Sequence, residues 1–340
     1  MLFLGSAPTR AQSKSQVAPV DQVAEFYRGR TITLSIGYAS GGGYDLYGRL
    51  ISKHFPRFLP GSPNVVVQNV PGGGSLLLAN QLFNTLPKDG SHIGIISNSL
   101  PLEEAFGLPQ AKFTANSFNW IGRLDDLTLI LIAWHTSKVS SVADALKLNF
   151  SIGVPGKGST ADSALSVIKQ ILNTQYQLIT GYRSGLETKM AMERGEVDAT
   201  ASVQWSTLRE INKDWIDTGK VRILVQLGLE KQPGLENVPL IGDFAPDQRS
   251  LDLINLLMAP AAIGRAIVAP PGIPPARVAA LRNAFDRMIS DPEFLEDARK
   301  QHLSINARSG ASLQKIVESI AGVPKTRLNE AKALFEAASR

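Results

Sequence analysis

Two glycine-rich turns have the residue types and the placement needed to bind an anion. Gly41, Gly42 and Gly43 follow the apolar run 32–38, and a second turn, residues 156–160, follows the apolar run 150–154. Each turn is expected to open a helix, whose first backbone N–H groups are unpaired and carry partial positive charge. Two such turns more than a hundred residues apart predict a cleft between two lobes that holds a carboxylate or similar group.

The side chains beside these turns have two possible roles, and both stay open. Asp45 can stabilise a helix start through its charge or contact the ligand. Ser159 and Thr160 can cap a helix or bind the ligand, and Tyr44 can line the mouth of the cleft or simply pack. Asn98, with Ser99 after it, ends a predicted strand, and open α/β sheets bind ligands at the carboxyl ends of strands.

Other chemistries lack their signatures. The third glycine of a dinucleotide-binding fingerprint would fall at Leu46, and Lys157 precedes the second glycine of its pair, where a phosphate loop needs a lysine after it. No Gly-x-Ser-x-Gly motif occurs. The histidines lack metal-ligand spacing; they are His54, His92, His135 and His302. We therefore predict no catalytic residues, no metal and no cofactor, and an enzyme on the same scaffold would need a nucleophile and base that are not evident.

Composition excludes several classes of protein. With 44% hydrophobic and 19% charged residues, the chain is typical of a folded globular protein. The net charge of +5 is dispersed, which does not favour a nucleic acid partner. The absence of cysteine rules out thiol nucleophiles, disulfides and thiolate metal sites. The longest apolar run, near residues 129–134, is far shorter than the ~20 residues of a membrane span.

The N-terminus permits two interpretations. Residues 1–4 are apolar, and Thr9 and Ala11 are small residues at the positions that precede a cleavage site. A full export signal also needs a basic start and a longer apolar stretch. We interpret residues 1 to about 11 as the remnant of an export signal, and a plain disordered leader is the alternative.

Strand and helix patterns alternate along the chain and predict two α/β units. In the first unit we expect strands at 31–37, 64–70 and 93–97, a helix at 75–86, and a helix whose buried face carries Leu46, Leu50, Ile51, His54 and Phe55. Residues 127–134 then cross to a second unit, which runs through strand 221–227, and residues 254–268 bring the chain back. The alternation predicts parallel sheets with helices on both faces. A helix that begins at Pro274 and Pro275 should close over the first lobe.

An ordered set of short motifs resembles one family, the receptors of tripartite tricarboxylate transporters, or Bug-type extracytoplasmic solute-binding proteins. The motifs occupy residues 26–33, 41–45, 65–74, 87–90, 156–160, 181–185, 193–198, 237–239 and 269–274. The resemblance extends from about residue 26 to the C-terminal helices. It implies a type II periplasmic binding protein fold, in which two α/β lobes joined by crossing strands close on a small carboxylate held by main-chain amides and water.

The resemblance also implies where the ligand binds, because the loops matching residues 38–45 and 156–160 face each other in the family and the loop 182–185 borders the cleft. The predicted ligand-binding residues are Tyr38, Ser40, Gly41, Gly42, Gly43, Tyr44, Asp45, Asn98, Ser99, Lys157, Gly158, Ser159, Thr160, Tyr182 and Trp205. Tyr44 stands where the family usually has a small hydroxyl residue, and residues 182–185 also depart from the common pattern. Tyr44 and Trp205 suggest an aromatic or longer acid.

From these observations we expect a periplasmic receptor that delivers a small organic acid to membrane permease subunits. A periplasmic sensor that presents its closed form to a signalling receptor is the alternative. We expect a monomer. The predicted organisation is a leader at 1–25, a first lobe made of 26–127 and 262–340, and a second lobe made of 128–261.

Overall fold

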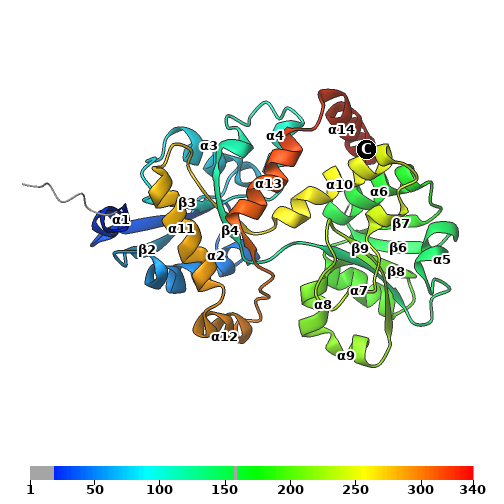
Figure 1. Ribbon diagram of the computed structural model, residues 1–340. Coiled ribbons are helices and arrows are strands. Elements are labelled where there is room, and N and C mark those ends of the chain that lie inside the picture. Colours follow the sequence, from blue (N-terminus) through cyan, green and yellow to red (C-terminus); the bar gives the residue numbers. More distant parts are fainter. Residues whose placement is uncertain (1–18, 157–158, 340) are drawn as a thin grey trace, which may run out of the picture.

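The computed structural model describes residues 19–156 and 159–339. The proposed export-signal remnant and two predicted ligand-binding residues, Lys157 and Gly158, lie outside them. The described chain forms two α/β lobes, with the helix α10 between them (Figure 1). This confirms the two-lobed α/β architecture.

The first lobe is built on a six-stranded sheet. Its strands, in spatial order, are β11 (Arg308–Ser309), β4 (Asn119–Arg123), β10 (Ala266–Ala269), β3 (His92–Ile95), β1 (Thr31–Ile36) and β2 (Asn64–Asn69). One face packs against α1 (Pro19–Tyr27), α2 (Gly43–His54), α11 (Pro275–Met288) and α12 (Pro292–Lys300). The other face packs against α3 (Leu76–Asn84), α4 (Leu100–Ala105) and α13 (Gly310–Ala321).

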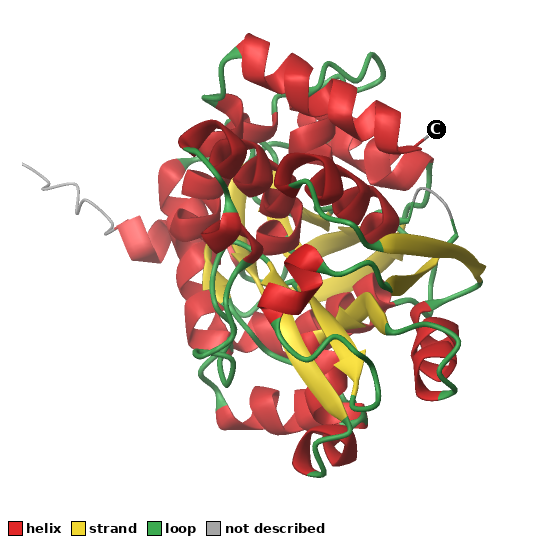
Figure 2. Ribbon diagram, turned by 90° about the vertical axis from the view of Figure 1, so that its right-hand side faces the viewer, coloured by secondary structure: helices red, strands yellow, loops and turns green. Residues whose placement is uncertain are grey.

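The second lobe is built on a five-stranded sheet. Its strands, in spatial order, are β7 (Gln177–Tyr182), β6 (Ser151–Pro155), β8 (Ala199–Gln204), β5 (Leu129–Trp134) and β9 (Val221–Leu227). Its helices are α5 (Val142–Lys147), α6 (Thr160–Leu172), α7 (Gly185–Glu193), α8 (Trp205–Ile211) and α9 (Lys213–Asp217). Helices lie on both sides of the strands (Figure 2), and separate apolar clusters fill the two faces.

The sheets are mixed, which corrects the expectation of parallel sheets. β1 is parallel to β2 and β3, and β6 is parallel to β7 and β8. In contrast, β10 is antiparallel to β3 and β4, and β5 is antiparallel to β8 and β9. A strand–helix–strand unit returns its second strand parallel to the first. β5 and β10 are the first strands after the chain changes lobes, so no such unit fixes their direction.

The buried face of α2 is the expected one except at a single position. Tyr47, Leu50, Ile51 and His54 are buried, at the spacing of one helix face, whereas Leu46 is 41% exposed. The helix ends at His54, and Phe55 begins a short 3-10 helix because the following residue is a proline. Because Tyr47 rather than Leu46 lies on the buried face, the start of α2 is turned toward the segments that connect the two lobes.

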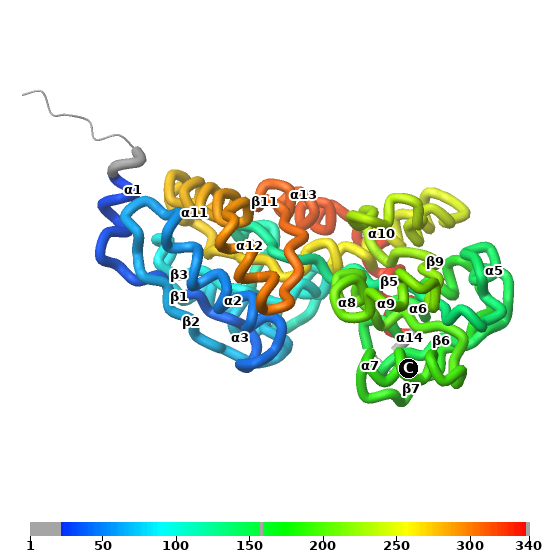
Figure 3. Tube along the Cα trace, turned by 90° about the horizontal axis from the view of Figure 1, so that it is seen from below, coloured from blue at the N-terminus to red at the C-terminus, as the bar shows by residue number. Residues whose placement is uncertain are grey.

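The chain crosses between the lobes three times. Residues 124–128 lead from β4 to β5, and α10 (Gln248–Ile263) leads back to β10. The two crossings touch at Gly264, which has φ +58°, and a Cβ there would lie 2.3 Å from the carbonyl oxygen of Asp125. Only glycine fits this approach. Figure 3 shows the lobes as two masses joined through this region.

The C-terminal helix α14 (Lys325–Ser339) makes the third crossing. It packs on α6 and α10, and Lys332 Nζ also donates to the carbonyl oxygen of Phe106 beside α4, at 3.0 Å. α11 and α13 cover the first sheet as expected, but α14 lies instead against both lobes. Among the described residues, no helix has the length and apolar character needed to span a membrane.

Candidate functional site

The glycine turn before α2 is fixed by a buried carboxylate. Asp45 accepts hydrogen bonds from the Gly41 N–H, from Arg49 Nε and from Asn69 Nδ2, each at 2.9 Å. The hydrogen bonds from Arg49, Gly41 and Asn69 together lower the pKa of Asp45 to about 2, with the Arg49 hydrogen bond as the largest cause, while burial opposes the shift. Both carboxylate oxygens of Asp45 accept hydrogen bonds from the protein. Asp45 therefore fixes the shape of the turn and keeps a negative charge beside the start of the helix. Gly41 has φ +88°, a conformation that favours glycine.

Two tyrosines form a platform beside this turn. The rings of Tyr38 and Tyr44 are stacked with centroids 4.3 Å apart. The Tyr44 hydroxyl donates to Asn98 Oδ1 at 3.1 Å, and Asn98 Nδ2 donates to the carbonyl oxygen of Pro260 at 2.7 Å. Burial raises the pKa of Tyr44, so its hydroxyl keeps its proton and remains a donor. The first turn of α2 is thereby linked through Asn98 to α10.

A buried ion pair behind the platform was not predicted from the sequence. The Arg265 guanidinium carbon lies 5.8 Å from the Tyr44 ring centroid and 4.9 Å from that of Tyr47, and Arg265 Nη1 is 3.2 Å from Asp125 Oδ2. Tyr47 also donates to Asp125 Oδ2, at 3.2 Å. Burial raises the pKa of Asp125 to about 7, while Arg265 opposes that shift. Arg265 interrupts two buried apolar runs, which is the sequence signal that could have identified it.

The second turn ends in a capped helix. The Ser159 hydroxyl accepts a hydrogen bond from the Asp162 N–H at 3.3 Å, as an N-cap does for α6. Ser159 therefore caps this helix, and contact of its hydroxyl with a ligand stays a prediction. Thr160, the first residue of the helix, is exposed and lines the cavity described next.

A cavity of about 160 Å³ lies where the lobes meet. Asn98 of the first lobe and Thr160 and Gln204 of the second lobe line it. The remaining lining residues are apolar and come from the crossing segment, β5, α6, β9 and α10: Leu127, Leu129, Ala164, Leu227, Leu257, Met258, Pro260 and Ala261. The structure thus brings Asn98 and Thr160, from opposite lobes, to one cavity, and Asn98 connects it to the α2 turn.

The other predicted site residues lie elsewhere. Ser40 is exposed on the α2 turn, and Ser99 Oγ is 2.8 Å from Ser97 Oγ at the start of α4. Tyr182 lies at the end of β7 in a shallow groove beside α7. Trp205 is 7% exposed in the core of the second lobe, and its indole N–H donates to the carbonyl oxygen of Pro233. Trp205 is therefore a packing residue in this structure, because its one polar atom is already bonded.

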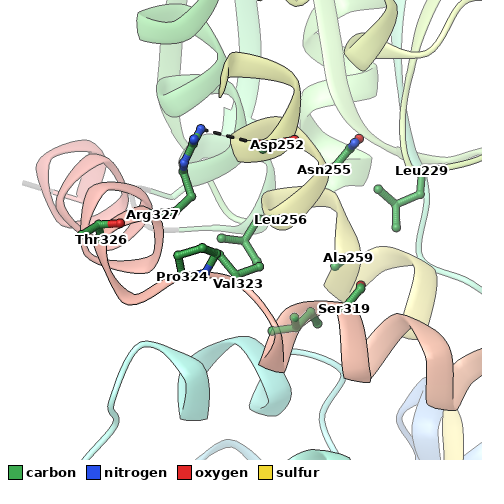
Figure 4. Close-up of a pocket in the computed structure, with 11 residues that line it drawn as sticks. Leu229, Asp252, Asn255, Leu256, Ala259, Ser319, Val323, Pro324, Thr326 and Arg327 are labelled. Carbon is green, nitrogen blue, oxygen red and sulfur yellow. Dashed lines mark ion pairs between the residues drawn. The ribbon is translucent and has the colours of Figure 1, made fainter. Parts of the chain in front are cut away.

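A larger groove of about 540 Å³ lies on the opposite face of α10. Figure 4 shows Asp252, Asn255 and Leu256 of α10 facing Pro324 and Arg327 of the α13–α14 region, with Arg327 directed toward Asp252. The helix positions that line this groove and those that line the cavity fall on opposite sides of α10. One helix therefore separates the two hollows. Within the described residues, no cluster of three or more acidic or histidine side chains could hold a metal ion.

The two lobes, the three crossings and the shared cavity define a two-lobed binding protein. A family model described as "Tripartite tricarboxylate transporter family receptor" matches residues 60–326. The chain therefore belongs to the tripartite tricarboxylate transporter receptor family. The proteins of this family and their structural neighbours are binding proteins and not enzymes.

Individual relatives are distant in sequence and similar in fold. A Cupriavidus necator protein described as "UPF0065 protein in gbd 5'region" is 24% identical over 306 residues, covering 87% of this chain and 86% of that protein. A solute-binding protein from Polaromonas has a TM-score of 0.69 at 19% identity, with 92% of this chain and 99% of that chain covered. An R. palustris protein solved with adipate has a TM-score of 0.56 at 18% identity, with 90% and 97% covered. These likenesses establish the type II periplasmic binding protein fold.

Proposed function

We propose that this chain is a periplasmic receptor that captures a small organic acid between its lobes and delivers it to the permease subunits of a tripartite tricarboxylate-type transporter. The observation that carries the proposal is the cavity lined by both Asn98, which is bonded to Tyr44 in the first turn of α2, and Thr160, which begins α6. The adipate bound in the R. palustris neighbour supports an acid as the ligand.

The energetics require both lobes. A helix terminus contributes about 0.3–2 kcal/mol toward binding an anion, whereas micromolar affinity needs roughly 8 kcal/mol. Hydrogen bonds to a charged group contribute about 1.5–3 kcal/mol each. Several donors from both turns must therefore converge on the acid group. Closure of the lobes is then the signal that a membrane partner reads.

Binding is tested by titration calorimetry of the purified protein with acids of several classes. We expect at least one acid to bind, and Thr160→Val to weaken it about fivefold or more because the cavity loses a hydroxyl. Thr180→Val, an exposed position on β7 of the same lobe, is the matched control and should bind as the parent does. Equal affinity of all three proteins would place the site elsewhere. A panel without any binding acid would overturn the proposal.

Delivery and location are tested in cells. We expect the mature protein to be exported and monomeric, and deletion of its gene to abolish uptake of the bound acid. Mass spectrometry of the exported protein identifies its N-terminus. Recovery of a cytosolic protein with Met1 intact would contradict export.

A further inference from the structure

We propose that the bound acid has an apolar body, so that the receptor prefers aliphatic or aromatic monocarboxylates of about six carbon atoms to hydroxylated di- and tricarboxylates. The inference rests on the proposed function, since it assumes that an acid occupies the cavity between the lobes. The acid group would lie beside Asn98 and Thr160, and the body would fill the rest of the cavity.

The lining of the cavity favours such a body. Eight of the eleven lining residues are apolar, and Leu257, Met258 and Leu227 belong to the packed core of the second lobe. None of the eleven residues carries a charge. A second carboxylate or a hydroxyl placed against these side chains would lose its water without gaining a partner, which disfavours polar ligands.

The cavity offers few polar groups to a ligand. Three of its lining residues are polar, namely Asn98, Thr160 and Gln204. Thr160 begins α6, and Asn98 is bonded to Tyr44 in the first turn of α2. Asn98 already uses one donor on Pro260 and one acceptor position on Tyr44. A ligand with one acid group can use these few polar groups and place its hydrocarbon part against the eight apolar side chains.

The size of the cavity sets the length of that part. Its volume of about 160 Å³ is close to the roughly 150 Å³ of an apolar cavity known to bind benzene. A six-carbon ring or a chain of similar volume therefore fits. A buried methylene group tightens binding roughly fourfold.

The first test is a chain-length series measured by titration calorimetry. Butanoate, hexanoate, octanoate and benzoate are compared with malate and citrate. We expect affinity to rise roughly fourfold per methylene up to hexanoate, to level off at octanoate, and to be high for benzoate. Malate and citrate should bind more weakly than hexanoate. Tighter binding of malate or citrate than of hexanoate overturns this inference and leaves the proposed function standing, whereas binding of no acid overturns both.

The second test fills the cavity. Ala164→Leu adds three carbon atoms from α6, where Ala164 is only partly buried, so the variant keeps the helix. We expect it to weaken hexanoate at least tenfold while butanoate changes less than threefold. The matched control is Ala333→Leu, at an exposed position of α14, which should leave the whole series unchanged. An equal loss for both acids in Ala164→Leu, with an unchanged melting temperature, contradicts the placement of the hydrocarbon part.

Discussion

At the scale of single residues, the site depends on side chains that hold its turns in place. Asp45 holds the α2 turn through three donors, and Asn98 holds Tyr44 against α10. Asp45 could be proposed from the sequence because it follows the glycines at a helix start, and Asn98 because it ends a predicted strand. Arg265 and Asp125 were not predictable, because they meet across 140 positions through a fold that no local pattern describes. The ligand contact of Trp205 stays a prediction, while its ring packs in the core of the second lobe and its N–H is bonded to Pro233.

We predict that Asp45→Ala destabilises the protein by about 2 kcal/mol, because the Gly41 N–H and Asn69 lose a charged acceptor. Binding of the acid should weaken as well, since the turn is no longer held. Urea denaturation and calorimetry measure the two effects. Arg49→Ala is the control: the Arg49 side chain is 54% exposed, and its loss should destabilise the protein less than Asp45→Ala does. Equal losses in both variants would show that the Arg49 ion pair alone holds the turn.

The same carboxylate predicts a response to acid. The pKa of Asp45 is about 2 in the folded protein against an ordinary 3.8. A lowered folded-state pKa stabilises the protein above about pH 4, and this contribution is lost as the pH falls toward 2. The Asp45→Ala variant should therefore approach the parent in stability over that interval. Parallel stability curves for the two proteins between pH 2 and 5 would contradict this role.

For Asp125 we predict the opposite dependence of folding stability on pH. Its pKa is about 7 when folded and 3.8 ordinarily, so the unfolded chain releases its proton first and stability falls as the pH rises from about 4 to 7. The Asp125→Asn variant has no carboxyl group to titrate at this position. Its stability relative to the parent should rise by on the order of 3 kcal/mol across this interval, and urea denaturation at several pH values measures it. A constant difference between the two proteins would show that Arg265, Tyr47 and Arg123 together keep Asp125 charged.

At the scale of elements, the alternation predicted the strands β1, β2, β3, β6 and β9 and the helices α2, α3 and α11, while β4, the helix α10 and the direction of the crossing strands were not predicted. Strands β1, β2, β6 and β9 begin within a residue of the expected positions. β5 and β10 are antiparallel because the chain enters them from the hinge, and strand patterns carry no information about direction. The exposed Leu46 shows that an apolar residue at helical spacing need not face the core.

Gly264, between α10 and β10, has no room for a larger side chain. A methyl group there would meet Asp125 and Asp126 at distances of 2.3 and 2.8 Å, in a backbone conformation that side chains rarely adopt. We predict that Gly264→Ala lowers the free energy of unfolding by about 3 kcal/mol or more. Gly107→Ala also has positive φ (+78°) but has open space around it, so it should cost about 1–2 kcal/mol. Similar melting temperatures of the two variants would show that the two crossing segments move apart easily enough to admit the added methyl group.

At the scale of the whole molecule, the two lobes could be predicted because a chain of 340 residues exceeds one comfortable core. The boundaries of the lobes remain a prediction, since α14 contacts both sides of the hinge. Its bridging position could not be inferred from the sequence, because its apolar residues indicate that it packs but not against what.

We predict that the protein contracts when it binds its acid. A compact chain of 340 residues has a radius of gyration of about 20 Å. Small-angle X-ray scattering should give a larger value without ligand and a value nearer to this one at saturation, because the lobes close over the cavity. A saturated sample with an unchanged radius would show that binding occurs without closure.

Helix α10 lies between the cavity shared by the lobes and the larger groove on its opposite face, which we call the rear groove. This placement has a practical consequence. The chain contains no cysteine, so Ser319→Cys, at an exposed position of the rear groove, would carry a single fluorescent dye on the far side of that helix. The dye would report movements of α10 without obstructing the cargo. The labelled Ser319→Cys variant would thus serve as a fluorescent sensor for the acid that the receptor binds.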